Sequence, residues 1–209
     1  MTKAVFLDAL GTLVELEPPW LFLRERVPAE IGDKPLEGAV RAEMAYYKEH
    51  AHEGRDPASL ADLRARCAAL LSRELGVEIG VDELVDAVRM RAYPDAEPAL
   101  RTLRDRGLKL IVVSNWDCSL GSVLERCGLA PLLDGAISSA EAGSRKPEPG
   151  IFERALQLAG CEAGDALHVG DTAEEDRAGA EAAGIRAVLI DRTEGGAQIA
   201  SLSEIEEHL

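Results

Sequence analysis

Four polar residues of types that can carry chemistry follow short apolar runs in this 209-residue chain. They are Asp8 after residues 3–7, Ser114 after 108–113, Lys146 in the loop after 135–138, and Asp171 after 166–169. Short apolar runs that end in polar loops are typical of buried parallel strands. Ligands bind beyond the carboxyl ends of such strands, so we expect these four side chains to meet at one edge of a sheet.

A further acid, Asp176, follows Asp171 closely, and with Asp8 these two could surround one hard cation. Mg²⁺ prefers oxygen ligands and keeps several waters, so one or two carboxylates and a backbone carbonyl suffice to hold it. Three close carboxylates without a cation would repel one another and favour protonation. The three aspartates therefore predict a magnesium site, although Asp176 could also be an acid that favours a helix N-terminus.

Lys146 would bring a fixed positive charge to the same edge. It could hold a phosphate group and keep Asp8 ionised as a nucleophile. Ser114 and Asn115 offer a hydroxyl and an amide to ligand oxygens, or could cap the helix that follows them.

Helices alternate with the strands, which predicts an α/β fold with a doubly wound parallel sheet. The expected strands are residues 3–7, 108–113, 135–138, 166–169 and 186–190, and the expected helices are 97–106, 120–127, 150–159 and 176–183. Within residues 14–93, apolar residues recur at helical spacing, as at Leu60, Leu63 and Cys67, and no strand is expected. We therefore expect a core of residues 1–13 and 94–209, with an all-helical insertion of residues 14–93 that covers the site.

The chain carries 38 Asp and Glu against 23 Lys and Arg, a formal net charge of −15. Nucleic acid binding needs a basic surface, so this balance argues against a nucleic acid partner. No run approaches the length of a membrane span, and Asp8 comes too early for a signal peptide. Four cysteines without CxxC spacing indicate buried thiols rather than a zinc site or disulfides. We expect a soluble cytoplasmic protein that acts as a monomer or homodimer.

In chain order, these segments resemble the four motifs of the haloacid dehalogenase-like hydrolase superfamily. The matching segments are residues 8–13 (Asp-Ala-Leu-Gly-Thr-Leu), 112–115 (Val-Val-Ser-Asn), 146–147 (Lys-Pro), and 170–176 with 179–180. The insertion resembles the helical cap of the first type in that family. The resemblance implies a Rossmann-like core, a hydrolase activity and Mg²⁺ as the cofactor.

The resemblance also implies a role for each matching residue. Asp8 would be the nucleophile that forms an aspartyl intermediate, and Lys146 would neutralise charge during catalysis. The substrate, a small phosphorylated molecule, would be bound by Thr12, Ser114, Asn115 and Lys146. Magnesium would be held by Asp8, the backbone carbonyl of Leu10, Asp171 and Asp176.

Leu10 departs from the pattern of the family's phosphatases, which have a second aspartate two residues after the nucleophile. That aspartate protonates the leaving alkoxide and later activates water, a contribution of roughly 10²–10⁴-fold in rate. Leucine can do neither, so hydrolysis of an alkyl phosphate should suffer more than that of an acyl phosphate or an acidic phenol. Residues of the insertion that could supply the missing acid are Glu15, Glu17, His50 and His52.

Two alternatives remain open at this point. Haloacid dehalogenases of the same superfamily also lack the second aspartate and need no metal, and a halide could be held by Trp20, Arg24 and Arg41. Asp171 argues for a metal and so favours a phosphatase over a dehalogenase. The third reading is a weakly active or non-catalytic protein that binds a phosphorylated ligand, because a fold does not fix a function. His168, within a predicted strand, is expected to be a core residue.

Overall fold

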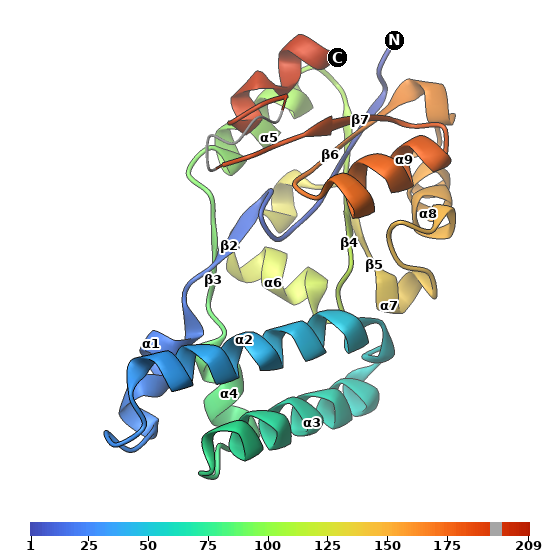
Figure 1. The fold of residues 1–209 in the computed structure, drawn as a ribbon. Coiled ribbons are helices and arrows are strands. Elements are labelled where there is room, and N and C mark those ends of the chain that lie inside the picture. The colour runs from blue at the N-terminus through green and yellow to red at the C-terminus, as the bar shows by residue number, and fades with distance from the viewer. Residues whose placement is uncertain (193–197) are drawn as a thin grey trace.

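A five-stranded sheet forms the centre of the computed structural model, which describes residues 1–192 and 198–209 (Figure 1). Its strands are β1 (Ala4–Leu7), β4 (Lys109–Ser114), β5 (Gly135–Ser138), β6 (Ala166–Gly170) and β7 (Arg186–Leu189). The spatial order is β5-β4-β1-β6-β7, and every neighbouring pair is parallel. The predicted α/β fold with a parallel sheet is confirmed.

Alternating side chains on the strands determine how the sheet is covered, because successive residues of a strand point to opposite faces. Val5 and Leu7 of β1 pack into one apolar cluster with helices α5 and α6, whereas Ala4 and Phe6 pack into another with α8 and α9. The covering helices are α5 (Ala96–Asp105), α6 (Leu120–Arg126), α8 (Pro149–Ala159) and α9 (Ala178–Ala182). Helices on both faces make the sheet doubly wound.

The helix expected over residues 176–183 begins differently in the structure. Residues Ala173–Arg177 form a π-helical turn, and α9 starts only at Ala178. Short elements that the sequence pattern did not predict are α7 (Ser139–Ala142) and the 3₁₀ turns Ala130–Leu132, Ala163–Asp165 and Leu202–His208. Elements of this length are too short to show a hydrophobic period.

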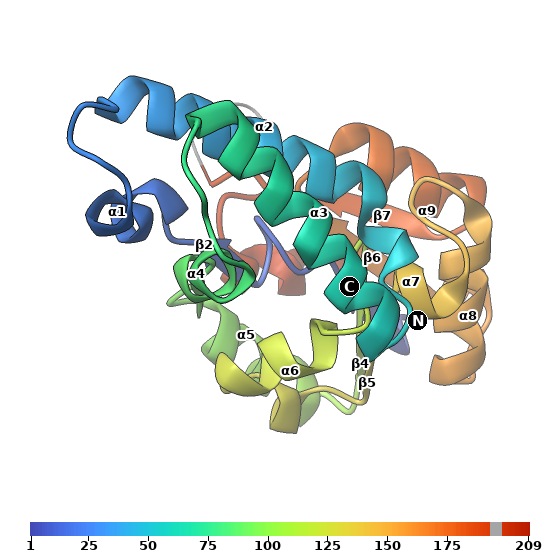
Figure 2. The same cartoon turned by 90° about the horizontal axis from the view of Figure 1, so that it is seen from below.

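The insertion after β1 consists mainly of helices that bury their own apolar cluster. Its elements are α1 (Pro19–Leu23), the 3₁₀ turn Arg24–Arg26, α2 (Asp33–His50), the 3₁₀ turn Ala51–Glu53, α3 (Pro57–Leu75) and α4 (Val81–Ala87). Seen from below, α2 and α3 lie side by side (Figure 2). Helix α3 has clear end signals: the Asp56 side chain accepts from Ala58 and Ser59 at its start, and Gly76 ends it at φ 67°.

The expectation that residues 14–93 contain no strand is wrong at both ends of this segment. β2 (Val14–Leu16) and β3 (Met90–Ala92) pair in antiparallel fashion and form a two-stranded stem between sheet and insertion (Figure 1). Three-residue strands are too short to show alternation, and their pairing joins segments more than 70 residues apart. Only the tertiary structure brings them together.

No helix among the described residues is long and apolar enough to span a membrane.

Helix α2 carries a buried acid, Glu43, and Cys67 of α3 is also buried. Burial raises the pKa of Glu43, because the charged form loses its hydration there. The folded protein therefore binds a proton at this residue over a pH range in which the unfolded chain has lost it. Stability must fall as the pH rises from the ordinary glutamate range through the raised value.

Glu43→Gln should remove this pH dependence, because the amide stays neutral at every pH. We expect the difference in melting temperature, variant minus wild type, to become more positive as the pH is raised from 4 to 8. Thermal unfolding followed by circular dichroism measures it. Glu37→Gln is the matched control: Glu37 lies on the same helix but pairs with Arg41 on the surface. An equal pH trend in both variants would contradict the assignment to burial.

Candidate functional site

The carboxyl ends of β1 and β4 and the loop after β5 bring three of the predicted residues into direct contact. Lys146 Nζ donates to Asp8 Oδ1 at 2.6 Å, and Ser114 Oγ donates to the same oxygen at 2.9 Å. All three side chains are buried. One carboxylate oxygen of Asp8 is thus fixed by two donors, and its second oxygen accepts no hydrogen bond from the described residues.

Lys146 also joins Asp8 to Asp176, since its Nζ donates to Asp176 Oδ1 at 2.5 Å. Burial by itself would lower the pKa of Lys146, but the two carboxylates outweigh that effect and hold it above its ordinary value. In turn, although burial opposes the shift, Lys146 and His168 hold the pKa of Asp176 well below its ordinary value. The charges of Lys146 and Asp176 therefore stabilise each other in this buried centre.

His168 completes this buried network from strand β6. Its Nε2 lies 2.8 Å from Asp176 Oδ1, and burial lowers the pKa of the ring. The imidazole is therefore neutral, and because the carboxylate can only accept, Nε2 must carry the proton and donate it. The amide of Thr172 donates to the other oxygen of Asp176 at 3.0 Å. The carboxylate of Asp176 thus accepts three hydrogen bonds, from Lys146 and His168 at Oδ1 and from Thr172 at Oδ2.

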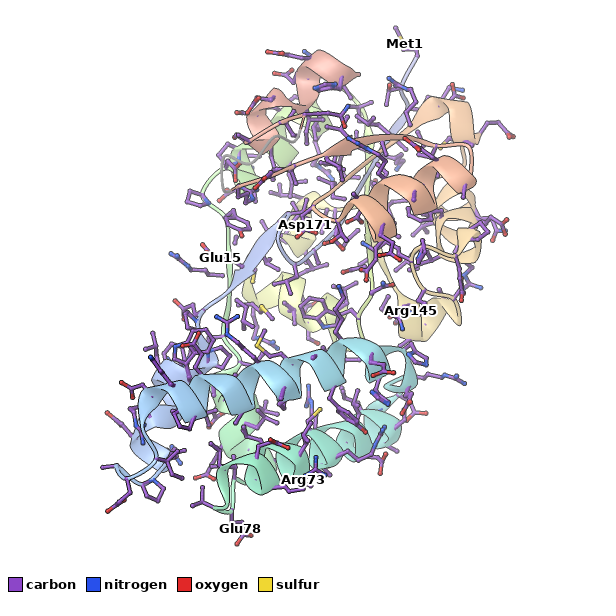
Figure 3. All side chains as sticks on the ribbon, viewed as in Figure 1. Met1, Glu15, Arg73, Glu78, Arg145 and Asp171 are labelled. Atoms are coloured by element: carbon purple, nitrogen blue, oxygen red, sulfur yellow. The ribbon has the colours of Figure 1, made fainter. Side chains whose placement is uncertain are left out.

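The predicted metal ligands form an acidic cluster in the structure. One oxygen from each of Asp8, Asp171 and Asp176 lies within 4.8 Å of the others. Asp171 is the exposed member, and Figure 3 places it at the edge of the sheet that faces the insertion. Partial loss of hydration, followed by the charge of Asp176, raises the pKa of Asp171 although its side chain is exposed. Three carboxylates beside one lysine leave an excess of negative charge, so the donor set fits one divalent cation with oxygen ligands.

The charge balance at Asp8 leads to the same conclusion. Burial raises the pKa of Asp8 to about 7, with smaller contributions from Asp176 and Asp171, while Lys146 opposes the rise. A nucleophilic carboxylate has to be ionised at neutral pH. A cation beside it would favour the ionised form, as an opposite charge nearby always does.

A tight turn after β1 holds the backbone around Asp8. The carbonyl of Ala9 accepts from the amides of Thr12, Leu13 and Val14, and Gly11 adopts φ 84°. A side chain at position 11 would collide with the carboxylate of Asp171, because its Cβ would lie 2.2 Å from Oδ2. Glycine is thus required at position 11 by both the backbone angle and the close approach of Asp171. The neighbouring Leu10 is 39% exposed at this turn.

Asn115 contacts the loop after β5 in this structure. Its Nδ2 donates to the carbonyl of Lys146, and its Oδ1 accepts from the amide of Lys146. These bonds fix the backbone of Lys146, so we assign Asn115 a positioning contact that the sequence did not reveal.

The hydroxyl of Thr12 is buried and has no hydrogen-bond partner among the described residues.

The C-terminal end of α2 meets the same loops from the side of the insertion. Tyr47 donates to the buried carboxylate of Asp117 at 2.7 Å, and Lys48 pairs with Glu175 at 3.0 Å. Glu175 also accepts from Asn115. Arg145, labelled in Figure 3 near the end of α2, donates to the carbonyl of Glu49. The insertion thus rests on the loops that carry the site.

The residues considered as a replacement acid have partners elsewhere or lie away from the described contacts of Asp8. Glu15 pairs with Arg91 across the stem, and His50 stacks on Tyr46 within the insertion. Among the described residues, the side chains of Glu17 and His52 form no hydrogen bond with Asp8, Lys146 or Asp176.

The three residues considered for a halide pocket also have contacts of their own. Arg24 donates to the carbonyls of Val27, Pro28 and Ile31, which fixes the loop before α2. Arg41 pairs with Glu37 and lies 5.3 Å from the ring centre of Trp20.

Sequence reasoning placed His168 in the core but missed its contact with the site. It is fully buried, as expected, yet it also fixes Asp176. The signal was available, because a polar side chain inside a buried strand requires a hydrogen-bond partner.

Removal of the two acids after β6, Asp176 and Asp171, should affect the free energy of unfolding differently. Asp176→Ala leaves His168 without its acceptor and Lys146 with one carboxylate fewer, at a cost of about 2 kcal/mol or more. Asp171→Ala removes a repelled, exposed carboxylate and should keep stability within about 0.5 kcal/mol of wild type, or raise it. Urea unfolding in excess chelator measures both, and equal destabilisation would contradict this division.

Several known proteins resemble this chain in sequence and in fold. The family model of haloacid dehalogenase-like hydrolases matches residues 2–184. A phosphoserine phosphatase from Thermus thermophilus is 39% identical over 105 residues, which are 50% of this chain and 42% of that protein. The chain spans about two-fifths of the length of several curated relatives that it matches.

Two solved structures share the fold over almost the whole chain. A phosphatase from Thermococcus onnurineus is 24% identical with a TM-score of 0.71, and covers 99% of this chain and 97% of its own. A dehalogenase crystallised with an intermediate complex is 22% identical with a TM-score of 0.74, and covers 100% and 97%. From the family match and from the ordered motifs around Asp8, this chain belongs to the haloacid dehalogenase-like hydrolase family.

Proposed function

We propose that this chain is a magnesium-dependent hydrolase of a small phosphorylated molecule, with Asp8 as the nucleophile. The observation that carries the proposal is the buried contact set of Asp8, in which Ser114 and Lys146 fix one carboxylate oxygen beside the acidic cluster. The phosphatase named above supports phosphoryl chemistry over other hydrolyses.

The reaction would begin with attack of the free Asp8 oxygen on phosphorus, opposite the leaving group. The phosphorus–oxygen bond to the leaving group breaks, and that oxygen departs with the electron pair. Water then hydrolyses the aspartyl phosphate, which releases phosphate and restores Asp8. Lys146 and Ser114 would orient the carboxylate, and the positive charge of Lys146 would stabilise the charge on the transferring oxygens.

Mg²⁺ would be held by Asp8, Asp171, Asp176 and the carbonyl of Leu10. When bound, it would supply electrostatic stabilisation of the phosphoryl oxygens. Thr12 and Ser114 would complete the contacts to substrate, while Asn115 would keep the Lys146 peptide in place.

Leu10 restricts the substrates that this site can turn over. An exposed leucine stands where an acid would protonate the leaving oxygen. A leaving group that is stable as an anion needs no such proton. We therefore propose that phosphates of acidic alcohols or of carboxylic acids are hydrolysed faster than simple alkyl phosphates.

The helical insertion would act as a cap over the site. Its stem begins directly after the nucleophile turn, and the end of α2 rests on the loops that carry Asn115 and Arg145. A cap at this place would exclude water from the aspartyl intermediate and select the substrate.

A metal-independent dehalogenase is the second candidate, favoured by one observation: Leu10 cannot act as an acid, and a halide leaving group needs none. The exposed carboxylate of Asp171 argues against it, because dehalogenation has no use for a metal ligand.

A paired activity screen separates these candidates. p-Nitrophenyl phosphate and acetyl phosphate should be hydrolysed with Mg²⁺ and lose activity in excess chelator. Asp8→Asn should lower kcat by about three orders of magnitude or more, since the nucleophile is removed. Phosphate release measured for wild type and variant, with and without Mg²⁺, decides the matter.

Three other outcomes would contradict the proposal. Full activity in chelator would exclude the metal. Chloride release from 2-chloropropionate without metal would favour the dehalogenase, and tight binding of a phosphorylated ligand without turnover would favour a binding protein.

Leu10→Asp tests whether the site lacks only its acid. The variant should gain activity toward alkyl phosphates by about 10²-fold, with a much smaller change toward p-nitrophenyl phosphate. Leu10→Asn is the control, since it has a similar shape but transfers no proton. Equal rates for the two variants would show that a missing acid does not limit the enzyme.

A further inference from the structure

Arg192, which lies just beyond strand β7, contacts the backbone of the nucleophile turn. Its Nη2 donates to the carbonyl of Thr12 at 2.6 Å, and its Nε donates to the carbonyl of Gly11 at 3.3 Å. These carbonyls belong to the turn whose amides converge on Ala9. The guanidinium therefore adds side-chain hydrogen bonds to a turn that is already stabilised by its own backbone hydrogen bonds.

The same guanidinium is held from the opposite side by the segment that returns from the insertion. Its Nη1 lies 3.1 Å from both carboxylate oxygens of Asp95, and its centre lies 3.7 Å from the ring centre of Tyr93. Both side chains of the ion pair are largely buried, at 16% and 22% exposed. Ion pairs with this burial and several hydrogen bonds are stronger than exposed ones.

Asp95 is itself fixed by the C-terminal part of the chain. Its Oδ2 accepts from Ser201 Oγ and from the amide of Leu202, both at 2.9 Å. Although burial opposes it, these bonds and Arg192 lower the pKa of Asp95, so the carboxylate is ionised at neutral pH. Asp95, which is held by Ser201 and Leu202, thus orients the Arg192 guanidinium.

The position of these contacts in the chain gives them their importance. The chain enters the insertion at residues 13–14 and returns to the core at residues 92–93, where the amide of Tyr93 donates to the carbonyl of Leu13. Arg192 contacts Gly11 and Thr12, just before the chain enters the insertion. It also contacts Tyr93 and Asp95, where the chain has returned to the core. One side chain therefore links the turn after Asp8, which leads into β2, to the segment that follows β3.

We propose that Arg192 is a positioning residue that holds the nucleophile turn and the base of the stem as one rigid unit. Movement of the insertion would then begin beyond this point and leave Asp8 in place. Lysine cannot substitute, because its single ammonium cannot reach two carbonyls and a carboxylate while stacking on the tyrosine ring. The assignment of a catalytic effect rests on the proposed function of Asp8, whereas the effect on the turn does not.

Arg192→Ala and Arg192→Lys test the proposal, with Arg186→Ala as the matched control. Arg186 also joins distant segments, since it donates to the carbonyl of His208 and to the hydroxyl of Thr2. It lies at the start of β7, whereas Arg192 lies past its end. A general loss of tertiary contacts would therefore affect both alanine variants alike.

Hydrogen exchange measured by mass spectrometry reports on the turn without any need for activity. We expect both Arg192 variants to speed exchange in peptides covering residues 9–14 by about tenfold or more, and Arg186→Ala to leave them unchanged. Unchanged exchange in Arg192→Ala, or an equal effect in Arg186→Ala, would overturn the proposal. If Arg192→Ala does not fold, Arg192→Lys and Asp95→Asn carry the same expectation for residues 9–14.

Kinetics with p-nitrophenyl phosphate and Mg²⁺ then test the effect on Asp8. Misplacement of the nucleophile should lower kcat about tenfold or more in Arg192→Ala and change KM little, because Ser114 and Lys146 remain in place. Arg186→Ala should keep wild-type kcat. A rise in KM with unchanged kcat would contradict a positioning role. Absence of turnover in the wild-type protein would count against the proposed function, while the exchange result would still decide the role of Arg192.

Discussion

A lysine held between two buried carboxylates organises this molecule. Lys146 contacts Asp8 and Asp176, which follow β1 and β6, and its own backbone is gripped by Asn115, which follows β4. An unpaired charge in the interior costs several kcal/mol, so each of these groups depends on the others. The ends of three strands and the loop after a fourth are thereby held together by charge as well as by the hydrogen bonds of the sheet.

The same network distinguishes the two buried aspartates. Asp176 has both oxygens occupied, by Lys146, His168 and Thr172, and serves as a fixed counter-charge. Asp8 shares the lysine but keeps one oxygen free of described donors. Two aspartates that look alike in sequence therefore differ in what they can do, because the number of donors around each differs.

The overall charge of −15 and an anionic substrate are compatible for a related reason. Charges more than about 8–10 Å away are screened at ordinary salt, so the acidic surface has little influence on the site. Close to Asp8, Lys146 and a divalent cation would dominate the local field. The global charge argues against a nucleic acid partner but says little about a single phosphate group.

The sequence by itself determined the parallel sheet, the helical character of the insertion, and the convergence of Asp8, Ser114 and Lys146. Apolar runs ending in polar loops are local patterns, and parallel strands carry their ends to one edge. The sequence did not determine which side chains hold those residues in place. The stem pairs strands of three residues each, and Asn115, His168 and Arg192 act on partners that lie 31, 8 and about 180 residues away. Such contacts leave no periodic trace in the chain, because they depend on which loops the folded sheet brings within hydrogen-bond distance, and only the tertiary structure decides that.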